Sequence, residues 1–154
     1  MDEKLQKQME EKIEKQVRET YYKAFYDSID ETINSDKPDY EWIVRLYSEV
    51  KDRLFRYVKK DSQIYKAIDE SFDILLFDQM IRNDVFNQES MVKMINNTFS
   101  WIQKLQAPVR DKETNESLRI VFESEPKNIV SVYLREVYKC LNNLDEDMYI
   151  FYKK

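Results

Sequence analysis

A chain of 154 residues that contains no glycine, no histidine and a single cysteine cannot assemble several common kinds of site. Without imidazole there is no ordinary general base, no Ser-His or Cys-His nucleophile pair and no Glu-x-x-His di-iron pair, and without glycine the usual phosphate-binding loops cannot form. The net charge of −5 and the lack of a basic stripe argue against nucleic acid as a partner, and no apolar run is long enough for a membrane span.

The first predicted element is one long helix over residues 2–34. Its apolar residues recur at every fourth position, which keeps them on one slowly turning helical face. The first half carries only this thin row among Glu, Lys and Gln, so we expect residues 1–20 to project from the body or to pair with another helix. The row consists of Leu5, Met9, Ile13, Val17, Tyr21, Phe25, Ile29 and Ile33.

A second helix is predicted after a break at residues 34–37. Asp36 is suited to cap it, with Pro38 and Asp39 among its opening residues, and its apolar steps continue to about Val58. The residues on its buried side are Trp42, Ile43, Leu46, Tyr47, Val50, Leu54, Phe55 and Val58.

The third and fourth helices are predicted from their caps. Asp61 or Ser62 caps a third helix that ends near Arg82, and Asn87 caps a fourth helix that Pro108 stops, because the proline ring cannot continue the hydrogen-bond ladder. Their inward residues are Ile64, Ile68, Phe72, Leu75, Leu76 and Met80 in the third helix, and Met91, Ile95, Phe99, Ile102 and Leu105 in the fourth.

The last third of the chain completes the predicted fold. Asp111 starts a shorter fifth helix, and Pro126 opens a final helix that we expect to be interrupted near residues 142–143. The prediction is an all-α, antiparallel bundle of five to seven helices, forming one domain over residues 1–154. One cysteine allows no internal disulfide and no signal-peptide pattern is present, so we expect an intracellular protein of the cytoplasm or nucleus.

Carboxylates are the remaining candidates for chemistry. Three acidic pairs are spaced one helical turn apart and could present oxygens to Mg²⁺, as in all-helical nucleotide pyrophosphatases. Solvated helix faces explain these pairs better in a chain with 30 acidic residues. We therefore assign no catalytic, cofactor-binding or metal-binding residue, and keep a Mg-dependent hydrolase as the alternative function. The pairs are Glu11 with Glu14, Asp27 with Asp30, and Glu70 with Asp73.

The cysteine and two aromatic groups complete the candidates. Cys140 is most simply a small buried hydrophobic residue. The helical spacing of the first aromatic group, at 21–26, favours a place in the core over a stacking platform. The group at the end of the chain is expected to be an exposed docking surface, since large apolar patches rarely face water. The two groups are Tyr21, Tyr22, Phe25 and Tyr26, and Tyr149, Phe151 and Tyr152.

Residues 105–111 read Leu-Gln-Ala-Pro-Val-Arg-Asp and resemble the Leu-Cys-Ala-Pro-x-Arg-Asp signature of the T-complex protein 11 family. Residues 24–29, 38–40 and 144–148 resemble further stretches of this family in the same order, Phe-Trp-Asp-Ser-Leu, Pro-Pro-Asp-Tyr and Leu-Asp-Met. The family domain is usually longer, so the resemblance describes its N-terminal portion or a minimal version. Gln106 stands where the family usually has cysteine, so no thiol chemistry is implied there. The candidate interaction residues of these motifs are Leu105, Pro108, Arg110, Asp111, Pro38, Asp39 and Tyr40.

The resemblance implies an α-helical, non-enzymatic protein that is tied in eukaryotes to cyclic-AMP and protein kinase A signalling, with roles in sperm function. The signature itself fits a structural corner and a binding site alike: Pro108 ends one helix, Asp111 caps the next, and Arg110 can form a bidentate pair with a carboxylate. We predict a protein-protein interaction module without a cofactor, whose partner is a protein, and we keep homo-oligomerisation through the N-terminal helix as a further outcome.

Overall fold

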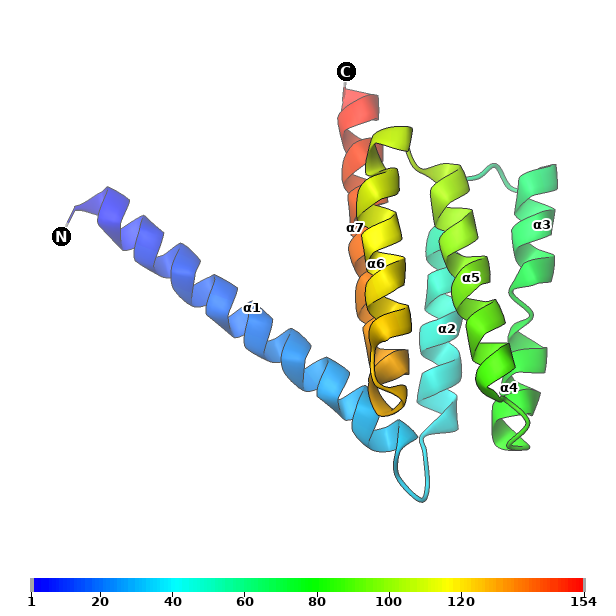
Figure 1. Ribbon diagram of the computed structural model, residues 1–154. Helices are drawn as coiled ribbons and strands as arrows, with labels where there is room; N and C mark the ends of the chain where they lie inside the picture. Colours follow the sequence, from blue (N-terminus) through cyan, green and yellow to red (C-terminus); the bar gives the residue numbers. More distant parts are fainter. Residues whose placement is uncertain (1, 154) are drawn as a thin grey trace.

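The computed structural model describes residues 2–153, which form seven α-helices and two short 3-10 turns and contain no strand. From α2 onward the chain runs alternately up and down the body, with α3 and α4 together forming one descending stretch (Figure 1). The predicted all-α, antiparallel bundle with a long N-terminal helix is confirmed. The elements are α1 Glu3–Ile33, α2 Tyr40–Phe55, α3 Gln63–Ser71, α4 Ile74–Arg82, α5 Gln88–Leu105, η1 Pro108–Arg110, α6 Asp111–Glu123, η2 Pro126–Asn128 and α7 Ile129–Lys153.

The core lies between α2, α5 and α7, with α1, α3, α4 and α6 packed around them. Each helix contributes residues at three- and four-residue steps, so one side of each is withdrawn from water. A polar pair is enclosed with them: the buried hydroxyl oxygens of Thr98 and Tyr133 lie 2.8 Å apart. The fully buried aliphatic residues include Ile29, Val50, Leu54, Ile68, Ile95, Ile102, Val121, Val137 and Leu141.

The first half of α1 leaves the bundle and projects into solvent (Figure 1). Near the body, Tyr26 and Tyr22 lie on the side of α1 that faces α7. The residues that continue this line outward, at three- and four-residue steps, are Arg18, Lys15 and Glu11. Packing them against α7 would remove charged groups from water, which is costly without partners. The helix therefore separates from α7 where its facing side becomes charged.

We define the arm as residues 3–20. A row of alternating charge stabilises its helical conformation. Acidic and basic residues alternate at every fourth position, so each charge has an opposite charge one turn before and after it. Lys15 lies 3.9 Å from Glu19, and Lys23 lies 2.8 Å from Asp27. The row occupies the side of α1 opposite to the apolar row. It consists of Glu3, Lys7, Glu11, Lys15, Glu19, Lys23 and Asp27.

The third predicted helix is in fact two helices, α3 and α4, and the prediction of one continuous element was wrong. The chain leaves helical geometry at Phe72, and the Asp73 carboxylate caps α4 by accepting from the Leu76 N–H at 3.0 Å. The Phe72 carbonyl, freed by the break, accepts from Lys51 Nζ at 2.8 Å. Because Phe72 is fully buried, the break also places its ring in the core.

Two smaller predictions also fail. α7 is continuous through Asn142 and Asn143, because both side chains bind outward, to Arg53 and Glu113, and do not compete for the helix backbone. α2 ends at Phe55, three residues earlier than predicted. The caps predicted at Ser62 and Asn87 are confirmed, and each accepts a backbone N–H of its own first turn.

Candidate functional site

The signature at residues 105–111 forms the corner that joins α5 to α6. α5 ends at Leu105, and extended backbone at Gln106 and Ala107 leads into the 3-10 turn that Pro108 opens. Proline suits this position because its ring fixes φ and its missing N–H needs no partner at the start of a turn. The predicted stop of this helix ahead of Pro108 is confirmed.

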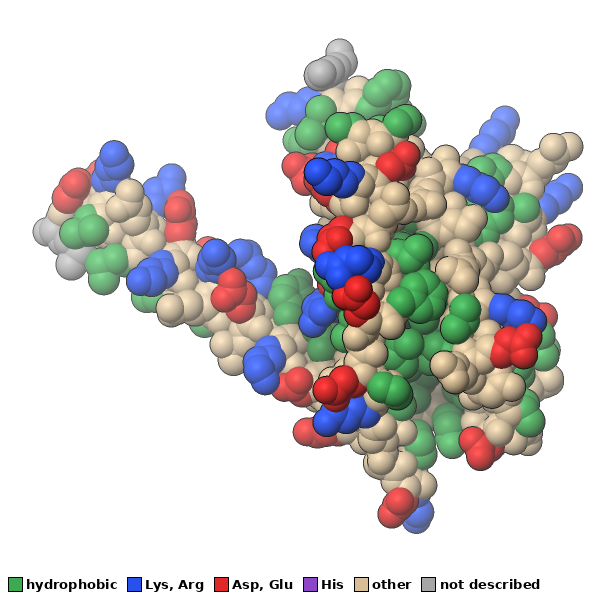
Figure 2. All heavy atoms as spheres, viewed as in Figure 1, with side chains coloured by type: hydrophobic (Ala, Val, Ile, Leu, Met, Phe, Trp, Pro, Cys, Tyr) green, Lys and Arg blue, Asp and Glu red, His purple; other side chains and the backbone are tan. Residues whose placement is uncertain are grey.

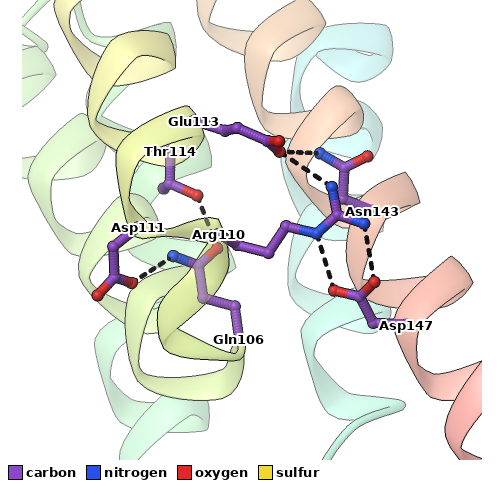
Figure 3. Close-up of polar contacts among 7 residues, drawn as sticks. All are labelled: Gln106, Arg110, Asp111, Glu113, Thr114, Asn143 and Asp147. Carbon is purple, nitrogen blue, oxygen red and sulfur yellow. Dashed lines mark hydrogen bonds and ion pairs between the residues drawn. The ribbon is translucent and has the colours of Figure 1, made fainter.

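Arg110 ends the turn and reaches across to α7 (Figure 3). Its Nε and Nη2 donate to the two carboxylate oxygens of Asp147 at 3.0 and 2.8 Å, and its Nη1 donates to Glu113 Oε2 at 3.0 Å. Two parallel bonds are the favoured geometry between arginine and a carboxylate. These hydrogen bonds lower the pKa of the Asp147 carboxyl and raise the pKa of the Arg110 guanidinium.

Gln106 closes the corner from the other side (Figure 3). Its Nε2 donates to Asp111 Oδ1 at 2.9 Å, and its Oε1 accepts from the Thr114 hydroxyl at 2.6 Å. The prediction that Asp111 caps α6 is wrong, because Asp111 is the first residue of that helix and its carboxylate binds the Gln106 amide. The amide uses both its donor and its acceptor here, whereas a cysteine thiol is only a weak donor and a weak acceptor.

The segment 144–148 of α7 meets both the corner and α2. Asp147 binds Arg110, as described, and Asp145 accepts from Arg53 Nη2 at 2.8 Å and from the Tyr57 hydroxyl. Leu144 is buried between these contacts. Two stretches that resemble the same family are therefore in direct contact. Neither aspartate was singled out from the sequence as a site residue, although the stretch that contains them was.

The motif at 38–40 lies at the opposite end of the bundle from the corner (Figure 1). Asp39 caps α2 by accepting from the Trp42 N–H at 3.0 Å, so the prediction that Asp36 is the cap is wrong. The N–H of Asp39 donates to the Thr32 hydroxyl at 2.7 Å, which fixes the turn between α1 and α2. The Tyr40 ring lies 5.8 Å from the Arg82 guanidinium. The seven motif residues therefore form two separate structural corners and not one site.

A groove of about 940 Å³ runs beside α7 and is lined by residues of α1, α2 and α7. Tyr22 and Tyr26 contribute from α1, Glu49 from α2, and Arg135 and Tyr138 from α7. Burial raises the pKa of the Tyr26 hydroxyl to about 12, and burial followed by the nearby Glu49 carboxylate raises the pKa of Tyr138. Both tyrosines are therefore neutral at physiological pH. The sequence singled out Tyr22 and Tyr26 as an aromatic group, but it did not identify Glu49, Arg135 or Tyr138, because residues of three distant segments form the groove.

The apolar row of α1 is uncovered over the whole arm. Leu5, Met9, Ile13, Val17 and Tyr21 are 49%, 49%, 56%, 64% and 66% exposed. Figure 2 shows these hydrophobic side chains along the arm among charges of both signs. The expectation that the aromatic group at 21–26 is core holds for Phe25 and Tyr26 and is wrong for Tyr21 and Tyr22, which face water.

The aromatic group at the end of α7 is exposed, as predicted. Tyr149, Phe151 and Tyr152 are 65%, 72% and 75% exposed, and hydrophobic side chains gather there at the top of the molecule in Figure 2. Cys140 is buried, as predicted, and burial raises the pKa of its thiol. The exposure of the terminal group and the burial of Cys140 are thus as expected, and the use of the terminal group as a docking surface stays a prediction.

Two of the three acidic pairs lie at different places along α1, and the third spans the break between α3 and α4. Asp27 is paired with Lys23, and Asp73 is the cap of α4. Across residues 2–153, no three His, Cys, Asp or Glu side chains are grouped closely enough to hold a metal ion. Within the same range, no helix combines the length and the apolar character that crossing a bilayer requires.

The fold and the arginine corner together define an all-helical bundle whose Leu-x-Ala-Pro-x-Arg-Asp turn is bound to its last helix. The sequence profile of one family, described as T-complex protein 11, matches residues 1–151. The chain therefore belongs to the T-complex protein 11 family, as its motifs indicated. No solved structure matches the chain.

Proposed function

We propose that this protein is a non-enzymatic interaction module that binds another protein through the arm of α1 and the adjoining groove. One observation carries the proposal: the five successive side chains of the apolar row from Leu5 to Tyr21 are about half exposed or more, and no other element of residues 2–153 covers them. Contiguous apolar surface of this kind marks binding sites in soluble proteins. A helix that presents anchors at fixed spacing is also a common mode of recognition.

The test is a binding experiment with a charged arm. Ile13→Lys combined with Val17→Lys places two ammonium groups in the apolar row, and we expect it to abolish capture of partners by the full chain in extracts of its host. Gln8→Lys combined with Gln16→Lys adds the same two charges to the same helix beside the row, and should capture partners as the parent does. Equal capture by both variants would contradict the proposal.

The alternative function is Mg-dependent hydrolysis by helical carboxylates. It is separated from binding by screening nucleotides for turnover with and without added Mg²⁺. Our proposal expects no turnover above background. Robust hydrolysis that Glu11→Gln or Glu14→Gln abolishes would establish the enzyme in its place.

Family membership points to the class of partner. T-complex protein 11 proteins are tied to cyclic-AMP and protein kinase A signalling, so the first candidates are the regulatory and catalytic subunits of protein kinase A. Cosedimentation of the full chain with each purified subunit tests this.

Self-association through the same row is the second use of the arm that its exposure favours. Sedimentation of the full chain beside a chain that starts at residue 20 tests it. If each chain sediments with the mass of its own monomer, self-association through the arm is ruled out.

A further inference from the structure

The groove beside α7 follows about three turns of that helix, and we call it the slot. Its floor is one side of α7, where Ser131, Arg135, Tyr138 and Asn142 follow one another at three- and four-residue steps. These steps cover about 16 Å of helix, or roughly three turns, at the usual rise per residue. α1 and α2 contribute most of the other lining residues, and Arg135 and Asn142 of α7 are exposed beside them.

Three of the four cations that line this slot already have a carboxylate partner, and Lys23 is paired with Asp27 as described above. Arg53 donates to Asp145 and Asn142, and Arg135 donates to Glu136 Oε2 at 3.2 Å. The remaining lysine that belongs to α7, Lys139, also lies near Glu116 of α6. The pKa of Glu116 is lowered mainly by Arg119 and in smaller part by Lys139. Lys139 forms no ion pair within residues 2–153, so an incoming anion would have to displace a carboxylate from each of the other three cations but not from Lys139.

Two carboxylates of the slot are not engaged in this way. Asp30 and Glu49 form no ion pair within residues 2–153, and Asp30 Oδ1 is buried there without a hydrogen-bond partner. A buried acceptor without a donor is costly, and a donor from a bound molecule would remove that cost. The buried Tyr138 hydroxyl, beside Glu49, lacks a partner as well. The uncompensated Asp30 oxygen is thus an acceptor without a donor, whereas the Tyr138 hydroxyl can donate as well as accept.

The rings of the slot favour the same kind of ligand. Tyr22, Tyr26 and Tyr138 all line it, and aromatic faces attract cations, arginine most often. The protein already uses this contact, since the Arg53 guanidinium lies 5.8 Å from the Tyr138 ring. A guanidinium has five donors in a planar fork and stacks on rings, whereas an ammonium group does neither as well.

We propose that the slot beside α7 binds an arginine-bearing helix of the partner, whose guanidinium groups donate to Asp30 and Glu49 and lie against the tyrosine rings. This inference rests on the proposed function and names the chemistry of the partner. It predicts binding that weakens with added salt, because the attraction is between charges at the protein surface.

The test uses two synthetic alanine-rich helical peptides of about 16 residues. One carries two arginines a turn apart, and the other carries glutamates at the same positions. Binding to the full chain is followed by NMR through the ring signals of Tyr26 and Tyr138. We expect the arginine peptide to move both signals and to bind at least about tenfold more tightly than the glutamate peptide.

Variants locate the binding. Asp30→Asn combined with Glu49→Gln should weaken the arginine peptide by about tenfold or more, because charged hydrogen bonds are lost. Glu31→Gln combined with Glu70→Gln removes the same two charges outside the slot and should leave the affinity unchanged. Preference for the glutamate peptide, equal affinity of the two double variants, or no binding of the arginine peptide would each overturn the inference. The arm experiment judges the proposed function independently, because its substitutions lie outside the slot.

Discussion

The Arg110 guanidinium holds the α5–α6 corner against α7, so Arg110→Ala should destabilise the fold. The side chains of Arg110 and Asp147 are 22% and 30% exposed, which places the pair between surface and buried ion pairs. Exposed pairs contribute about 0.2–1 kcal/mol, and hydrogen bonds to charged groups about 1.5–3 kcal/mol. We expect Arg110→Ala to lower the free energy of unfolding by about 1–2 kcal/mol.

A double-mutant cycle isolates the pair from the rest of the arginine contacts. Arg110→Ala, Asp147→Ala and the double variant are unfolded in urea and followed by circular dichroism, and the coupling energy is expected to be about 1 kcal/mol at neutral pH. The Glu113 contact stays with Arg110 in the Asp147 variant, so it does not enter the coupling.

The coupling energy between Arg110 and Asp147 should decrease when the pH is lowered into the acid range. The pKa of Asp147 is lowered from its ordinary value of 3.8. The stabilisation is therefore complete above that value and is lost as the pH falls through the lower pKa of the folded state. A coupling below about 0.3 kcal/mol at neutral pH, or one that grows as the carboxyl is protonated, would refute the reasoning.

Three further outcomes are expected. A chain that begins at residue 21 should keep the free energy of unfolding of the full chain within about 1 kcal/mol, measured in urea, because the removed apolar side chains are exposed. Lys15→Glu puts like charge beside Glu11 and Glu19, so amide exchange in the arm should quicken by roughly tenfold while the core is unaffected. Asp84 has a φ of 56° in the left-handed region, and thermal melting should find Asp84→Ala less stable than Asp84→Gly by about 1 kcal/mol; equal stability would contradict this.

The fold was predictable because its signals are local. Apolar residues spaced three and four positions apart mark each helix, and the N-caps Ser62 and Asn87 mark where α3 and α5 begin. The break at Phe72 was missed because its carbonyl depends on Lys51, 21 residues earlier in the chain, for a donor. No local pattern records such a contact, and the sequence around Phe72 has ordinary helical spacing.

Only one partner of the contact between Arg110 and Asp147 could be predicted from the sequence. The signature identifies Arg110 and its preference for a carboxylate, but Asp147 lies 37 residues further on among several acidic neighbours. Only packing of α6 against α7 selects it. The groove is harder still, since Glu49 and Tyr138 come from different helices and neither belongs to a motif.

The alternating row on α1 has a consequence for how the molecule responds to its solution. Ions weaken the attraction between exposed charges, and at about 1 M salt the screening distance falls to about 3 Å. The arm owes much of its helicity to such attractions, whereas the body owes its stability to buried apolar groups. Raising the ionic strength should therefore fray the arm from its free end while the body stays folded. We therefore expect the arm to be helical at low ionic strength and to become a flexible segment at high ionic strength.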